Sequence, residues 1–291
     1  MKAWLSVLAL VLVLFAFTYV WQSIRAPVTL RVSTTTSLYA TGLLEELAER
    51  FQEEHPNVII EFSPVGSGEA LRKAESGDVD LVFVHAPSLE KRYLEKGVLG
   101  SGEIFAYNTF IIVGPENDPA GIRDKNPIDA MISIFEAGEA GRAKFVSRGD
   151  NSGTHNRELW LWDLAGLNPS GRDWYVESGT GMAQTLMIAN EYGAYTLSDV
   201  GTYLKLSSDL TYLTPLVSRG NELLNVYSVY IVKDGINEEL AYEFQQFVLS
   251  DEIQEFIGNY GLEEFGRPLF NPAYGDVEGR LREVWNQLAG G

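Results

Sequence analysis

The chain has 291 residues, a length that suits one or two domains of ordinary size. Hydrophobic residues make up 45% and charged residues 21%, which is a globular composition and not a disordered one. The net charge of −18 argues strongly against nucleic acid as a partner, since phosphate contacts need clustered Lys and Arg. The absence of cysteine excludes disulfides and a lipidated cysteine, and three scattered histidines argue against a metal site.

The chain opens with an apolar run, Ala3–Trp21, of about 19 residues, which as a helix is close to the thickness of a bilayer core. Two interpretations stay open: a cleaved secretory signal, or an uncleaved anchor that attaches the protein to the membrane. Tyr19 and Trp21 resemble interfacial aromatics, and no small-x-small cleavage site follows, so we favour an anchor within residues 1–27. Either way, we expect the remaining chain to be extracytoplasmic.

From residue 28 onward, strand and helix signals alternate. Val28–Ser33 alternates apolar and polar residues, as strands do, and apolar residues between 43 and 51 then recur at helical spacing. Further strands are predicted at Val58–Phe62, Leu81–Val84, Asn108–Gly114, Phe145–Val146, Ala194–Leu197 and Val226–Val232. Further helices are predicted at Ile128–Ala137, Ala183–Glu191, Glu238–Leu249, Asp251–Tyr260 and Val277–Leu288. This alternation indicates α/β layers with mostly parallel sheets.

Small polar residues and glycines fill several turns between a strand and the next helix. Such turns occur at Thr34–Ser37, Gly66–Gly68, Gly149–Thr154 and Ser178–Met182. Backbone N–H groups at a helix start carry partial positive charge and favour an anion. Since ligands of open α/β sheets bind beyond the carboxyl ends of the strands, we expect these turns to meet in one cleft between two lobes.

The richest of these turns lies within Phe145–Glu158, FVSRGDNSGTHNRE. Arg148 adds a full charge and a planar fork of donors that suits an oxyanion, and Ser152 and Thr154 add hydroxyl groups. Asp150 would repel an anion, so we expect it to hold Arg148 or to cap the helix. The segment is therefore predicted to be an anion cradle.

Two histidines have structural interpretations. His85 follows the strand at 81–84 and is expected to be a hydrogen-bonded structural residue. His155 lies at a helix start, where we expect it to support the neighbouring backbone. A Ser152/His155 pair leaves an exported hydrolase as a remote alternative, but no nucleophile-elbow sequence accompanies it.

Together these segments resemble the tungstate-binding proteins of ABC-type uptake systems. The resemblance covers nearly the whole chain after the N-terminal segment. It is carried by TTTS at Thr34–Ser37, GDVDLVFVHAP at Gly77–Pro87, YNTFIIVGPENDPAGI at Tyr107–Ile122, SRGDNSGTHNRE at Ser147–Glu158, the pair Gly181-Met182, and AYTLSDVGTYL at Ala194–Leu204.

The resemblance implies an α/β, two-lobed type II periplasmic-binding fold with a ligand cleft between the lobes, preceded by the N-terminal apolar helix. Lobe one would comprise residues 28–112 and 233–291, and lobe two residues 113–232. The implied function is capture of tungstate by a monomeric, non-enzymatic receptor that delivers it to an ABC permease and ATPase, without a cofactor. A receptor for molybdate or another tetrahedral oxyanion is the alternative, and a membrane-anchored sensor without a transporter is a third.

The resemblance also implies the ligand residues, on the Thr34–Ser37 turn and around Arg148. Donors at these positions suit a tetrahedral oxyanion, whose oxygens only accept hydrogen bonds. The ligand residues we expect are Thr35, Thr36, Ser37, Ser67, Arg148, Ser152, Gly153 and Thr154. Supporting roles are expected for His155, Asp150 and Gly181, and no metal site is expected apart from the oxyanion itself. The sequence departs from the family pattern at three positions: Asn151, Arg157 and Thr180.

Overall fold

The computed structural model describes residues 27–290, so the predicted N-terminal helix lies outside the described residues. The strands are β1 Val28–Thr35, β2 Val58–Val65, β3 Leu81–Val84, β4 Leu99–Pro115, β5 Phe145–Ser147, β6 Tyr175–Glu177, β7 Thr196–Asp199, β8 Leu213–Val217, β9 Leu224–Val232 and β10 Asn271–Pro272. The helices are α2 Thr36–Ala40, α3 Leu43–Glu54, α4 Ser67–Glu75, α5 Pro87–Glu95, α6 Pro127–Glu139, α7 Gly153–Leu164, α8 Met182–Tyr192, α9 Val200–Leu206, α10 Glu238–Leu249, α11 Asp251–Asn259, α12 Leu262–Phe265 and α13 Glu278–Gly290, with 3-10 turns η1 Asn221–Leu223 and η2 Gly275–Val277.

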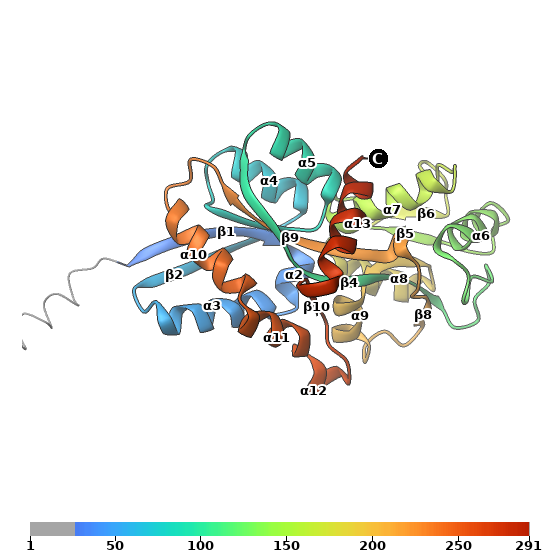
Figure 1. Cartoon of the computed structure of the whole chain (residues 1–291). Coiled ribbons are helices and arrows are strands. Elements are labelled where there is room, and N and C mark those ends of the chain that lie inside the picture. The colour runs from blue at the N-terminus through green and yellow to red at the C-terminus, as the bar shows by residue number, and fades with distance from the viewer. Residues whose placement is uncertain (1–26, 291) are drawn as a thin grey trace, which may run out of the picture.

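The long strand β4 connects two halves of the molecule (Figure 1). Its residues 99–109 pair with β9, within a sheet ordered β10-β4-β9-β3-β1-β2. Its residues 110–115 pair instead with β7 and β8. We call the elements around β1–β3 and β9 the first half, and β5–β8 with α6–α9 the second half.

The first half packs a hydrophobic core on each face of its sheet. In β3, Leu81 and Phe83 enter the core under α3, α10 and α11. Val82 and Val84, on the opposite face, enter the core under α4 and α5. The period-2 alternation of a strand buried on both faces explains why β3 is apolar throughout.

The second half repeats this arrangement on the far end of β4. Phe110 and Ile112 pack with α6 and α7, whereas Ile111 and Val113 pack with α8. α6 begins after Asn126, whose side chain accepts a hydrogen bond from the Asp129 N–H, as helix N-caps do. The predicted α/β architecture is confirmed.

The prediction of mostly parallel sheets is wrong. β1–β2, β1–β3 and β5–β6 are parallel, but β9 runs antiparallel to both β3 and β4. The chain leaves the first half along β4 and returns along β9, so these two strands must run in opposite directions. Alternation of strands and helices in the sequence carries no information about that return.

Within residues 27–290, no helix combines the length and the apolar character that a membrane span requires.

Candidate anion-binding site

Four helix starts converge where the two halves meet. α2 follows β1 and α4 follows β2 in the first half, while α7 follows β5 and α8 follows β6 in the second. A Cβ atom added to Gly66, before α4, would lie 3.6 Å from the Asp150 carbonyl oxygen before α7. A Cβ atom added to Gly181, before α8, would lie 3.7 Å from Thr36 Oγ1 in α2. The four polar turns predicted from the sequence therefore form one site.

Buried polar atoms without a hydrogen-bond partner gather in these turns. Among the described residues, eight buried side-chain nitrogen or oxygen atoms have no partner, and five of them belong to residues of, or next to, the four turns. These five are Oγ1 of Thr34, Oγ1 of Thr36, Oγ of Ser67, Nε of Arg148 and Oγ1 of Thr154. Each buried group left without a partner costs about 1–3 kcal/mol, so such a concentration points to a ligand that accepts hydrogen bonds. Thr34 belongs to the predicted Thr34–Ser37 turn, although it is not among the ligand residues named individually from the sequence.

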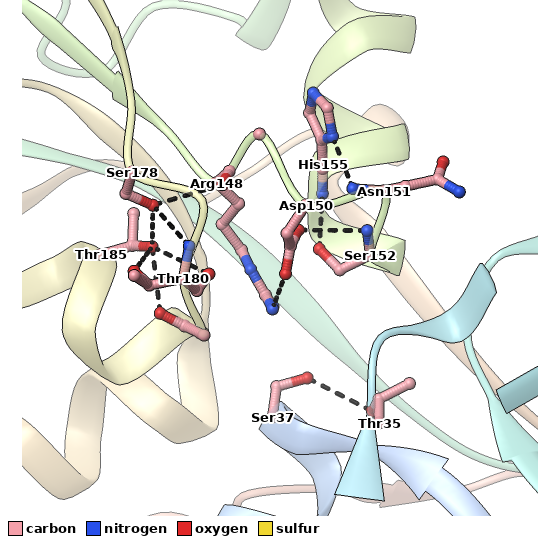
Figure 2. A network of polar contacts seen from close by, with 12 residues as sticks. Thr35, Ser37, Arg148, Asp150, Asn151, Ser152, His155, Ser178, Thr180 and Thr185 are labelled. Carbon is pink, nitrogen blue, oxygen red and sulfur yellow. Dashed lines mark hydrogen bonds and ion pairs between the residues drawn. The ribbon is translucent and has the colours of Figure 1, made fainter. Parts of the chain in front are cut away.

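Arg148 is the cation of this site. The residue is only 2% exposed, and its Nη2 donates to Asp150 Oδ2 at 2.5 Å. The other oxygen of Asp150 accepts from the Ser152 N–H at 3.1 Å. Figure 2 shows the Arg148 guanidinium next to the Asp150 carboxylate, with Thr35 and Ser37 across from them on the first half. Asp150 thus fixes both Arg148 and the start of α7, and Nε of Arg148 is left as a donor for a ligand.

His155 stabilises the start of α7 through a hydrogen bond to the backbone. Ser152 caps the helix, with its Oγ accepting from the His155 N–H at 3.2 Å. The His155 ring nitrogen Nδ1 accepts from the Asn151 N–H at 2.9 Å, across a turn in which Asn151 has a φ of 56°. Burial lowers the pKa of His155, which keeps the ring in the neutral, accepting form. The ring faces the backbone and not the Ser152 hydroxyl, so these contacts do not form a nucleophile–base pair.

Ser178 holds the backbone of Arg148 from the β6–α8 turn. The Ser178 hydroxyl donates to the Arg148 carbonyl at 3.3 Å, and the Gly179 N–H donates to the same carbonyl at 2.9 Å. Ser178 Oγ also lies 2.8 Å from Thr185 Oγ1, and Thr180 N–H donates to Ser178 Oγ (Figure 2). These positioning contacts were not predicted from the sequence, although the hydroxyl-rich SGTGM turn gave a signal for them.

A buried carboxylate lies beneath the site. Glu158 is 2% exposed and accepts hydrogen bonds from the Ser147 hydroxyl, the Trp162 indole and the Tyr175 hydroxyl. Burial raises the pKa of Glu158 to about 7, and these three donors oppose that shift. By fixing Ser147, Glu158 anchors the end of β5, from which Arg148 projects.

The ligand residues expected in α2 lie close together. Thr35 caps α2 and its Oγ1 lies 3.4 Å from Ser37 Oγ, which in turn lies 3.4 Å from His85 Nε2. Ser67 and Gly153 are the first residues of α4 and α7. Among the described residues, no group of three or more His, Asp or Glu side chains could hold a metal ion.

Two α/β halves joined by two strands, with donors from both halves at the junction, define a ligand-binding protein of the two-lobed type. The chain belongs to the PBP superfamily, whose domain matches residues 22–252. It is 38% identical to the tungstate-binding protein TupA of Peptoclostridium acidaminophilum over 245 residues, which cover 83% of this chain and 84% of that protein.

Two solved structures are similar as well. One is the tungstate-binding protein TupA from Desulfovibrio alaskensis G20, with 37% identity, a TM-score of 0.72, and coverage of 84% of this chain and 98% of that chain. The other is described as the tungstate ABC transporter from Geobacter sulfurreducens, with 40% identity, a TM-score of 0.71, and coverage of 80% and 98%. The family resemblance and the type II periplasmic-binding fold predicted from the sequence are confirmed.

Proposed function

We propose that this chain is an extracytoplasmic solute-binding protein that captures tungstate and delivers it to an ABC transporter. The observation that carries the proposal is the set of five buried, unpartnered polar atoms at the junction of the two halves. Tungstate is a tetrahedral dianion whose oxygens only accept hydrogen bonds, which matches four hydroxyl groups and a guanidinium N–H. The relatives that bear the name tungstate-binding protein support this choice of ligand.

The proposed ligand shell contains the residues expected from the sequence, with one addition. Arg148 supplies the formal positive charge, and the helix starts supply partial charges through their N–H groups. The hydroxyl donors are those of Thr34, Thr35, Thr36, Ser67, Ser152 and Thr154. The backbone N–H groups of Ser37 and Gly153 are further donors, with Asp150, His155 and Gly181 in support.

We further propose that the two halves are lobes that close on the ligand about β4 and β9. The boundaries between the two lobes expected from the sequence, at residues 112/113 and 232/233, remain a prediction. Strand pairing favours limits near Thr109 and Leu224, because β9 pairs with β3 over residues 228–231 and contributes to the core of the first half.

The partners in this proposal are an ABC permease and its ATPase, and the receptor acts as a monomer without a cofactor or a catalytic step. The N-terminal segment either anchors the protein or is removed on export. Molybdate stays the alternative ligand, because it shares the shape and charge of tungstate.

Calorimetric titration of the exported chain with tungstate, molybdate, sulfate and phosphate tests the function. We expect tight one-to-one binding of tungstate and much weaker binding of sulfate and phosphate. Preference for molybdate would favour the alternative ligand. Absence of tight binding to all four anions would contradict the proposal, and ester hydrolysis that disappears in Ser152→Ala would favour an enzyme.

A further inference from the structure

His85 lies at a point where three parts of the molecule meet. Its Nε2 lies 3.4 Å from Ser37 Oγ in the first half, and its Nδ1 lies 2.9 Å from Asn225 Oδ1 on β9. From the second half, Gly153 approaches so closely that an added Cβ would lie 2.7 Å from the ring carbon Cε1. The residue itself is only 2% exposed. The imidazole therefore separates the start of α7 from the Thr34–Ser37 segment at the start of α2, which we call the α2 turn.

The ring is held rigidly in this place. Asn225 Nδ2 donates to Asn108 Oδ1 at 3.1 Å and to Tyr227 OH at 2.7 Å, so Asn225 Oδ1 is turned to accept from His85 Nδ1–H. This leaves His85 Nε2 as an acceptor for the Ser37 hydroxyl. The Tyr227 ring packs on the imidazole with centroids 4.9 Å apart. Burial lowers the pKa of His85 to about 3, so the ring stays neutral.

We propose that His85 is a spacer that sets how closely the α7 start can approach the α2 turn, and so determines the size of the oxyanion that the closed site fits. The inference rests on the proposed function. α7 carries Thr154 and α2 carries Thr36, so the distance between their donors follows from the thickness of the imidazole between the two turns. Tungstate is larger than sulfate at the same charge and shape. A fixed spacer therefore favours the larger anion, since donors held apart cannot contract onto the smaller one.

Removing the spacer tests the proposal through a ratio of affinities. In His85→Ala, we expect the ratio of the sulfate Kd to the tungstate Kd to fall by about tenfold. Without the ring the two turns can approach more closely, so tungstate loses affinity equivalent to about one hydrogen bond and sulfate gains affinity. If His85 were a purely structural residue, its loss would weaken the binding of both anions to the same extent. An unchanged ratio would therefore overturn the proposal. The matched control is His55→Ala, which removes an imidazole stacked on Phe51, away from the site, and should leave the ratio unchanged.

A second variant keeps the test informative if His85→Ala fails to fold. Gly153→Ala places a methyl group against the imidazole, so we expect tungstate binding to weaken by at least about tenfold. Adding His85→Ala to Gly153→Ala removes the opposing ring, and part of the lost affinity should return. Normal binding by Gly153→Ala, or no recovery in a folded double variant, would overturn the spacer role. If the wild type binds neither anion, the proposed function fails; if it binds tungstate and the ratio does not move, only the spacer inference fails.

Discussion

Arg148→Ala is expected to weaken tungstate binding by about 3 kcal/mol or more, which corresponds to more than a hundredfold in Kd. The guanidinium is buried, and its Nε has no partner within residues 27–290. Truncation removes the formal positive charge of the site and leaves the Asp150 carboxylate beside the ligand, where it repels a dianion. Calorimetric titration of the folded variant measures the loss.

Two control variants separate the site charge from general electrostatics. Arg172→Ala removes an exposed guanidinium that pairs with Glu139 on the surface, and we expect its tungstate affinity to equal that of the wild type. Arg148→Lys retains the charge but not the planar fork, so an intermediate affinity is expected. Wild-type affinity in Arg148→Ala would remove this residue from the proposed ligand shell.

Replacing two unpartnered hydroxyl groups is expected to change binding and stability in opposite directions. Ser67→Ala and Thr154→Val delete donors from α4 and α7, so the double variant should bind tungstate at least about a hundredfold more weakly. The same change removes two buried groups without partners, so the free energy of unfolding without ligand should rise by about 1–2 kcal/mol. Titration and urea unfolding give the two quantities.

Thr196→Val provides the matched control for this prediction. The Thr196 hydroxyl is also buried, but it donates to the Val146 carbonyl at 2.7 Å. Its loss should lower the free energy of unfolding by about 1 kcal/mol and leave tungstate contacts in place. If Ser67→Ala with Thr154→Val destabilises the protein as this control does, the two hydroxyl groups serve the fold and not a ligand.

The donor turns could be predicted from the sequence because each has a local signal. In the sequence, Thr34–Ser37 and Gly149–Thr154 follow a predicted strand and precede a helical pattern, and in the structure a strand is followed by a helix at both places. The short helix α2, which begins at Thr36 directly after β1, was not predicted. Which hydroxyl groups are left for a ligand was not predictable. Ser152 and Thr154 look equivalent in the sequence, yet Ser152 Oγ accepts from the His155 N–H, whereas Thr154 Oγ1 has no partner within the described residues.

Contacts between residues that lie far apart in the chain could not be predicted from the sequence either. His85 was expected to be hydrogen-bonded, and it is, but its partner Asn225 lies 140 positions further along. Glu158 ends the Phe145–Glu158 segment, and nothing in the sequence of that segment marks it as a buried carboxylate with three hydrogen-bond donors. The direction of β9 follows from the return of the chain between halves, which no local spacing encodes.

Donors from the four turns are proposed to enclose one tetrahedral oxyanion, and the most direct test locates the metal atom of that anion. Crystals grown with tungstate and measured at the tungsten absorption edge would show it as an anomalous peak. We predict one strong peak per chain among the starts of α2, α4, α7 and α8, with oxyanion oxygens within hydrogen-bonding reach of Arg148 Nε and Thr154 Oγ1. A principal peak elsewhere in the chain, or tungstate bound without contact to these two groups, would contradict the account.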